Sequence, residues 1–372
     1  MSGHRATDWG RARALVAQGA APLPVAGRAL VDAEGSVTAE AVRALRPLPH
    51  YDSSAMDGWA VHGSGPWTLG ETAEPIVTGA LVPAWCEAVV PLEEGTSRDG
   101  VLTTARRPAP GRHIRRAGDE AAADAVLVEA GTRLGPPQLA LLAIAGHDAV
   151  RVRPRPAVAL LFTGDEIDTS GMPEPGRVRD AFSPLLPPLV RALGGTIDSV
   201  TRLGDDEAAI TALLTGPTAP LIVTTGGTGR SRADAVRRAI VAAGGRTIVD
   251  GVAMRPGHPT LVAALPGDRL VIALPGNPLA AVLAALSFLP PAIDAASGVA
   301  GGSLEDGVLG EDLGRPGTTT LVPVRREGGC WRAAAGIRSH MLTGLAASEA
   351  VAVVPPEGGC AGDRVPLLRL PW

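Results

Sequence analysis

A repeated pattern of strand, glycine turn and helix constrains this chain more than any other feature. It is clearest in residues 220–240, PLIVTTGGTGRSRADAVRRAI. Residues 221–223 are apolar and suit a buried strand, and apolar residues at helical spacing follow Gly226, Gly227 and Gly229. Glycines let the backbone approach a ligand, and free N–H groups at a helix start attract anions. One such loop alone is more typical of an ordinary strand-to-helix turn than of a ligand site.

The same pattern occurs twice more, in LVIALPGNPLAAVL (residues 270–283) and in VALLFTGDEI (residues 158–167). In the first of these, Asn277 is a preferred N-cap residue and Pro278 suits the first helical turn. The carboxyl ends of parallel strands meet at one edge of a sheet, where such folds bind ligands. The three loops therefore predict a single ligand site at that edge.

Composition narrows the class of protein. A chain of 372 residues exceeds one ordinary core, so we expect two to four domains. The net charge of −4 gives no basic footprint for nucleic acid. Apolar runs are interrupted before they could span a membrane, and no signal-peptide pattern occurs. Three widely spaced cysteines argue against a disulfide framework or zinc site and favour a reducing cytoplasm.

Strands and helices alternate regularly over residues 157–296, which predicts a parallel sheet covered by helices on both faces. Before this region, residues 11–18 and 39–45 are predicted helices. Residues 87–92 and 100–106 are predicted strands of a small β-rich domain, with a hairpin near Asp99-Gly100. Short β segments after residue 304 predict a terminal β domain.

A turn-rich run holds Asp52, Ser53, Ser54 and Asp57. Such side chains commonly satisfy local backbone donors and nothing more. Two carboxylates and two hydroxyls within six residues could equally coordinate Mg²⁺ or hold a polar substrate.

Five motifs identify a resemblance that covers nearly the whole chain. They are Ser54-Ala55-Met56-Asp57-Gly58, Thr78-Gly79-Ala80, Thr163-Gly164-Asp165-Glu166, Pro256-Gly257-x-Pro259 and Leu274-Pro275-Gly276-Asn277-Pro278. In this order they resemble the molybdopterin molybdenumtransferases, which include the E domain of gephyrin. The resemblance implies an enzyme that inserts molybdenum from molybdate into adenylylated molybdopterin with Mg²⁺ and releases AMP. It also implies a homodimer.

The resemblance implies an α/β and β multidomain fold of four parts. A discontinuous N-terminal linking and dimerisation domain would take residues 1–47 and 118–153, and a small β-rich domain residues 48–117. The molybdopterin-binding α/β domain, of three layers with a mostly parallel sheet, would take residues 154–298. A C-terminal β domain would take residues 299–372.

The resemblance also assigns roles to residues. The catalytic acids would be Asp57, Glu166, Asp205, Asp206 and Asp234, with Asp205 and Asp206 as alternative matches to one family acid. Of these, Asp57, Glu166 and Asp234 would hold Mg²⁺. The substrates would be bound by Thr78, Gly226, Gly227, Thr228, Gly229, Arg255, His258, Pro275, Gly276, Asn277 and Ser339.

Two departures from the family pattern shape further expectations. The sequence Arg255-Pro256-Gly257-His258-Pro259 replaces K-P-G-K-P, in a chain whose 34 basic residues are all arginine. If Arg255 and His258 hold molybdate, His258 must be protonated, and affinity should fall between about pH 6 and 8. The sequence T-T-G-G-T-G is closer to the related molybdopterin adenylyltransferases. An adenylyltransferase and a non-catalytic paralogue that binds the pterin or a partner therefore remain alternatives.

Overall fold

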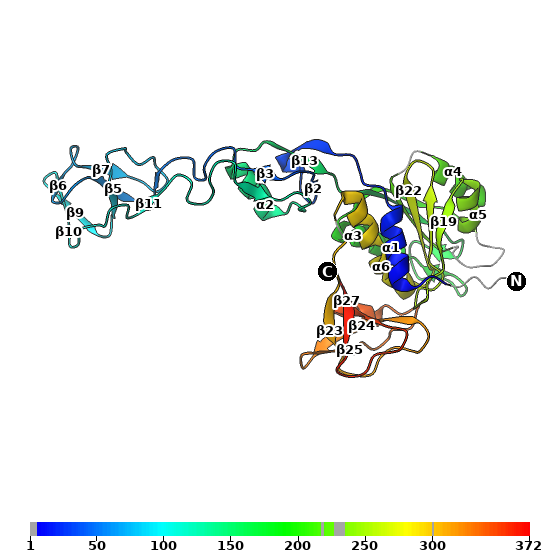
Figure 1. The fold of residues 1–372 in the computed structure, drawn as a ribbon. Coiled ribbons are helices and arrows are strands. Elements are labelled where there is room, and N and C mark those ends of the chain that lie inside the picture. The colour runs from blue at the N-terminus through cyan, green and yellow to red at the C-terminus, as the bar shows by residue number, and fades with distance from the viewer. Residues whose placement is uncertain (1–5, 217–218, 227–234, 300) are drawn as a thin grey trace. The chain divides into compact units, whose positions relative to one another are not determined.

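The computed structural model describes residues 6–216, 219–226, 235–299 and 301–372 (Figure 1). Contacts divide the chain into two compact units. The first holds residues 1–26, 35–37 and 153–372, and the second holds residues 27–34 and 38–152. Each unit is described by itself.

A six-stranded sheet forms the centre of the first unit, in the order β17-β14-β18-β22-β21-β19. The strands are β14 (Ala157–Phe162), β17 (Thr196–Arg202), β18 (Leu221–Thr225), β19 (Arg246–Asp250), β21 (Leu261–Leu265) and β22 (Arg269–Leu274). The first four in the order are parallel neighbours. β21 runs antiparallel to β22, because a tight turn with positive φ at Gly267 and Asp268 returns the chain at once, and β19 pairs antiparallel with β21. The expectation of a mostly parallel sheet is confirmed.

Helices cover both faces of this sheet, as predicted. Along β14, Val158 and Leu160 face one hydrophobic cluster while Ala159 and Leu161 face another, which follows from the two-residue period of a strand. The first cluster includes residues of α1 (Trp9–Gly19), α3 (Phe182–Ala192) and α6 (Pro278–Ser297). The second includes residues of α4 (Glu207–Thr215) and α5 (Ala235–Ala242).

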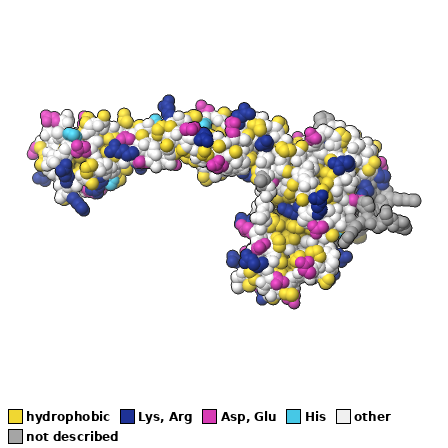
Figure 2. All heavy atoms as spheres, in the orientation of Figure 1, with side chains coloured by type: hydrophobic (Ala, Val, Ile, Leu, Met, Phe, Trp, Pro, Cys, Tyr) yellow, Lys and Arg dark blue, Asp and Glu magenta, His cyan; other side chains and the backbone are white. Residues whose placement is uncertain are grey.

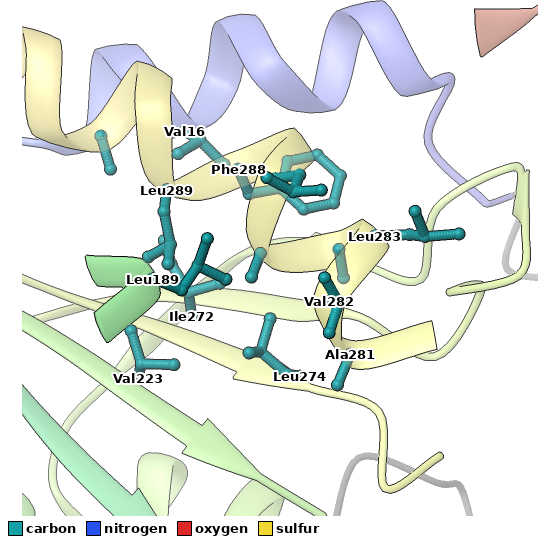
Figure 3. Close-up of a cluster of buried hydrophobic side chains, with 14 of the residues drawn as sticks. Val16, Leu189, Val223, Ile272, Leu274, Ala281, Val282, Leu283, Phe288 and Leu289 are labelled. Carbon is teal, nitrogen blue, oxygen red and sulfur yellow. The ribbon is translucent and has the colours of Figure 1, made fainter. Parts of the chain in front are cut away.

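Helix α6 is the core helix of this domain. Figure 3 shows it between α1 and the sheet, with Phe288 near Val16 of α1 and Leu289 above Ile272 of β22. It is apolar on every side, which is typical of a helix buried all round. Among the described residues it is the one helix long and apolar enough to cross a membrane, but 78% of that stretch is buried inside the protein.

Helix α1 packs with the α/β domain. Asp8 caps it by accepting a hydrogen bond from the Arg11 backbone N–H at 2.9 Å. The Trp9 indole Nε1–H donates to Ser287 Oγ of α6 at 3.0 Å in a buried contact. Residues 6–26 therefore belong with the α/β domain, whereas the resemblance assigned residues 1–47 to the linking domain.

A second sheet of the first unit has the order β20-β24-β26-β27-β23, with β25 beside β24. Its strands are β20 (Met254–Arg255), β23 (Glu305–Val308), β24 (Thr319–Glu327), β25 (Cys330–Ala333), β26 (Ala350–Val354) and β27 (Arg364–Arg369), and α7 (Thr343–Ala346) precedes β26. β20 comes from the α/β part of the chain and pairs with β24. This pairing brings Arg255 beside the C-terminal β domain.

The second unit consists of short elements. In chain order they are β1 (Ala26–Ala29), η1 (Leu30–Asp32), β2 (Val37–Thr38), β3 (Val42–Arg43), β4 (Ser53–Ser54), β5 (Gly58–Val61), β6 (Trp67–Thr68), β7 (Ala73–Ile76), β8 (Ala88–Pro91), β9 (Gly95–Arg98), β10 (Val101–Thr104), β11 (Ile114–Arg115), β12 (Val126–Val128), α2 (Pro136–Ile144) and β13 (Ala149–Arg153). The β9–β10 hairpin confirms the predicted turn, because Asp99 and Gly100 both have positive φ.

The predicted helix over residues 39–45 is wrong. Only residues 42–43 of this segment form regular structure, as strand β3, and Val42 pairs with Val128 of β12. Alanine raises helix propensity only weakly, and pairing with a distant strand outweighs it here. Val42 and Val128 belong to a hydrophobic cluster with Leu142 of α2.

Candidate functional site

The three predicted loops meet at one edge of the central sheet, because β14, β18 and β22 are parallel neighbours. Thr163 Oγ1, after β14, donates to the Thr225 carbonyl at 2.7 Å. The Gly226 N–H donates to the Leu274 carbonyl at 3.2 Å, which ties the end of β18 to the end of β22. A Cβ on Gly276 would lie 3.9 Å from Gly226 Cα, so these two turns are in contact.

Gly226 has a φ of 78°, a conformation that favours glycine. The predicted residues Gly227, Thr228, Gly229 and Asp234 lie outside the described residues, and their roles stay predictions. Just before this loop, the buried hydroxyl groups of Thr224 and Thr225 find no hydrogen-bond partner within the described part of the chain. Buried polar groups without partners are costly, so this strand end is suited to a polar ligand.

Acids gather at the ends of β14 and β17. Partial desolvation raises the pKa of Asp205, and the negative charges of Asp165 and Glu166 raise it further. Repulsion of this kind would be relieved by a bound cation. No group of three or more His, Cys, Asp or Glu side chains in the described residues is arranged as a metal centre.

The structure separates the roles of the two adjacent acids. Asp206 is the N-cap of α4, where its Oδ1 accepts from the N–H groups of Ala208 at 2.9 Å and Ala209 at 3.2 Å. Asp205 instead feels the charges of the acids after β14. Asp205 is therefore the better match to a site acid, and Asp206 is used by its helix.

Asn277 reaches away from the helix that it precedes. It occupies the N-cap position of α6, with Pro278 next as predicted, yet its side chain makes no capping hydrogen bond. Its Nδ2 donates to Ser339 Oγ at 3.4 Å, and the Ala280 N–H donates to the Ser339 carbonyl at 3.3 Å. Two predicted site residues far apart in the sequence are thus in contact. Pro275 and Gly276 precede Asn277 in the same turn.

An open pocket of about 900 Å³ lies beside this contact. Three arginines, Arg255, Arg315 and Arg338, line it together with Ser339, and no acid does. The remaining lining residues are Pro256, Thr320, Leu321, Val322, Gly336, Ile337 and Met341. The pocket is suited to an anion.

His258 does not line this pocket. Its Nδ1 lies 2.8 Å from the Val252 carbonyl oxygen, and the Val252 N–H donates to the His258 carbonyl at 2.9 Å. The sequence predicted Arg255 and His258 as a cationic pair, but it missed Arg315 and Arg338. Neither of these arginines belongs to one of the five family motifs. Their position near glycines of the C-terminal domain was the one sequence signal that could have pointed to a binding site.

In the second unit, Asp57 and Thr78 come together. The Thr78 N–H donates to Asp57 Oδ1 at 2.6 Å, and this hydrogen bond, with one from the Thr78 side chain, lowers the pKa of Asp57. Asp57 also lines a pocket of about 480 Å³ with Glu74. Asp52 instead accepts from Ala117 N–H at 2.8 Å and pairs with Arg116 at 2.6 Å, so its role is local.

Two family models match the chain, one after the other along the sequence. Residues 7–146 match the family model "MoeA N-terminal region (domain I and II)", and residues 159–295 match "Probable molybdopterin binding domain". The chain is 33% identical over 303 residues to molybdopterin molybdenumtransferase 2 of Mycobacterium tuberculosis, covering 73% of this chain and 75% of that protein. The chain belongs to the molybdopterin molybdenumtransferase family.

A second member, the molybdopterin molybdenumtransferase of Synechococcus elongatus, is 30% identical over 302 residues, covering 73% of this chain and 75% of that protein. The fold agrees with a solved structure titled molybdopterin biosynthesis moeA protein from Pyrococcus horikoshii OT3. That structure covers 98% of this chain and 100% of its own, with a TM-score of 0.76 at 21% identity. In this molybdopterin molybdenumtransferase family member, the matched molybdopterin-binding region contains all three converging loops.

Proposed function

We propose that this chain is a molybdopterin molybdenumtransferase, which inserts molybdenum from molybdate into adenylylated molybdopterin and releases AMP. One observation supports this most strongly. The loops of the matched molybdopterin-binding region contact, through Asn277 and Ser339, a pocket whose charged lining is entirely cationic. A phosphate-bearing pterin and an oxyanion are the two substrates that this arrangement suits.

The two substrates divide between two surfaces in this proposal. The turns that carry Gly226 and Gly276 expose backbone next to the start of α6, which suits the phosphates of the pterin. Molybdate, a dianion at neutral pH, takes the pocket at Arg255 and Ser339. Guanidinium groups bind such oxyanions through paired N–H donors. Gly227, Thr228 and Gly229 are proposed to extend the pterin surface.

Mg²⁺ fits as an ion shared with the substrate. It prefers oxygen ligands and is commonly held by one or two carboxylates together with phosphates. Glu166 and Asp205 supply carboxylates at the sheet edge, where partial burial and then the charges of Asp165 and Glu166 raise the pKa of Asp205. A bound Mg²⁺ ion would supply positive charge beside the phosphoanhydride, and these carboxylates would position it there. Asp57 and Asp234 remain proposed participants.

The resemblance also favours a cytoplasmic homodimer of four-domain chains, and we include this in the proposal, with α1 assigned to the α/β domain. The first unit has an apolar groove of about 630 Å³ lined by residues of α3, α6 and α7 and by Trp372. Figure 2 shows hydrophobic side chains gathered at the surface beside α3 and α6. Association would remove such a surface from water. Sedimentation of the full chain tests the oligomeric state.

A reconstituted reaction tests the activity. The full chain is given adenylylated molybdopterin, molybdate and Mg²⁺, and AMP and pterin-bound molybdenum are measured. Release of AMP that depends on molybdate supports the proposal. A parallel reaction with ATP and bare molybdopterin tests the adenylyltransferase alternative. Binding of the pterin without either reaction would favour the non-catalytic alternative.

A further inference from the structure

We propose that Arg338, rather than His258, completes the cationic site for the oxyanion with Arg255 and Arg315. This inference rests on the proposed function, because it takes molybdate to be the anion that the pocket receives. It assigns a substrate-binding residue that lies outside the motifs recognised in the sequence.

The first argument is the state of the three guanidinium groups. Within the described part of the chain, no hydrogen bond or ion pair engages the side chains of Arg255, Arg315 or Arg338. Other arginines of the C-terminal β domain do have carboxylate partners. Arg325 contacts Glu327 at 2.6 Å, and Arg369 contacts Glu305.

Three like charges that line one pocket without a carboxylate repel one another. A dianion bound among them would offset this repulsion and could accept charge-assisted hydrogen bonds from the guanidinium groups. The charge of the pocket is therefore complementary to that of an oxyanion with two negative charges.

The second argument is the orientation of His258. Its Nδ1 is held 2.8 Å from the Val252 carbonyl, so this ring nitrogen donates within its own loop. The loop is closed again by the Val252 N–H, which donates to the His258 carbonyl at 2.9 Å. His258 thus stabilises the turn that presents Arg255.

The third argument is the anchoring of Arg338. The next residue, Ser339, accepts from the Asn277 side chain and from the Ala280 N–H at the start of α6. The Met341 N–H donates to the Arg338 carbonyl at 2.8 Å and closes a turn. A backbone fixed on both sides holds a binding residue more accurately than a free loop does.

Binding of molybdate alone to the full chain, measured by equilibrium dialysis, tests the inference without requiring turnover. Arg338→Gln should weaken binding about tenfold or more, the range for loss of a hydrogen bond to a charged group. Arg338→Lys should recover part of the affinity, since lysine restores the charge without the planar fork. The matched control is Arg326→Gln, an exposed arginine of β24 outside the pocket lining, which should bind as the wild type does.

The variant His258→Gln tests whether His258, rather than Arg338, binds the oxyanion. Its molybdate affinity should lie within about twofold of the wild-type value, provided that circular dichroism shows an intact fold. In turnover, Arg338→Gln should raise the KM for molybdate far more than it lowers kcat.

Two outcomes would count against different claims. Wild-type affinity in Arg338→Gln, together with a loss in Arg255→Gln, would overturn the role of Arg338 and keep the pocket as the oxyanion site. Wild-type affinity in Arg255→Gln, Arg315→Gln and Arg338→Gln alike would overturn the location of molybdate itself.

Discussion

Asn277 donates a hydrogen bond from Nδ2 to Ser339 Oγ across 3.4 Å, and this contact joins the start of α6 to the C-terminal β domain. An asparagine at an N-cap position ordinarily binds its own helix. Here the side chain contacts a loop 62 residues away in sequence. The turn proposed for the pterin phosphates and the loop proposed for the oxyanion are thereby fixed relative to each other.

Because Asn277 does not cap α6, its removal should affect function more than stability. We predict that Asn277→Ala lowers kcat/KM about tenfold while the free energy of unfolding changes by less than about 0.5 kcal/mol. The control is Asp206→Ala, which removes a true cap of α4 and should cost about 1 kcal/mol. Denaturant titrations and steady-state kinetics measure both effects. A larger loss of stability in Asn277→Ala than in Asp206→Ala would contradict this interpretation.

If Asn277 and Ser339 act as a pair, their effects on the reaction should not add. Ser339→Ala and the double variant with Asn277→Ala should show nearly the same kcat/KM, since either change breaks the one contact. Independent, multiplicative losses would mean that the two residues serve the reaction separately.

Burial of Asp205, together with the nearby charges of Asp165 and Glu166, predicts that neutralising this residue stabilises the fold in a pH-dependent way. A carboxyl whose folded pKa is raised binds a proton more readily in the folded state, so its ionised form costs stability at neutral pH. Asp205→Asn should raise Tm at pH 7 by about 1–2 °C, and the difference should shrink as the pH falls toward about 4. The same variant should show a smaller rise in Tm on addition of Mg²⁺ than the wild type. A lower Tm at pH 7 would show that Asp205 is stabilised by its neighbours.

Asp57 offers a test in the second unit. Asp57→Asn retains an oxygen that can accept the Thr78 N–H bond but removes the negative charge. We expect turnover to fall about a hundredfold with an unchanged fold, if the carboxylate orders Mg²⁺ or handles a proton. Glu74→Gln is the matched control, because Glu74 lines the same pocket and should keep most of the activity. Equal turnover in both variants would remove Asp57 from the reaction.

The fold was largely predictable because its signals are local. The strands ending at Phe162, Thr225 and Leu274 have apolar runs bounded by glycine turns, and parallel pairing then forces their loops to one edge. The helix predicted over residues 39–45 does not form, because Val42 pairs in a β-ladder with Val128, which is distant in the sequence. Local propensity contains no information about such pairing.

The site was less predictable for a related reason. Arg315 and Arg338 become relevant only when β20 pairs with β24 and brings Arg255 to the C-terminal domain. Likewise, the spacing around Asn277 predicts a capping residue, and only the position of Ser339 in space explains why the side chain turns elsewhere. The hydrophobic periodicity of a segment predicts its own secondary structure, but it does not predict which residues of another domain that segment will contact.

The most direct test is a single-turnover reaction of the full chain with adenylylated molybdopterin, Mg²⁺ and either molybdate or no oxyanion. We predict molybdate-dependent release of one AMP for each molybdenum transferred to the pterin. A folded protein that binds both substrates but releases no AMP and transfers no molybdenum would contradict the assignment as a molybdopterin molybdenumtransferase.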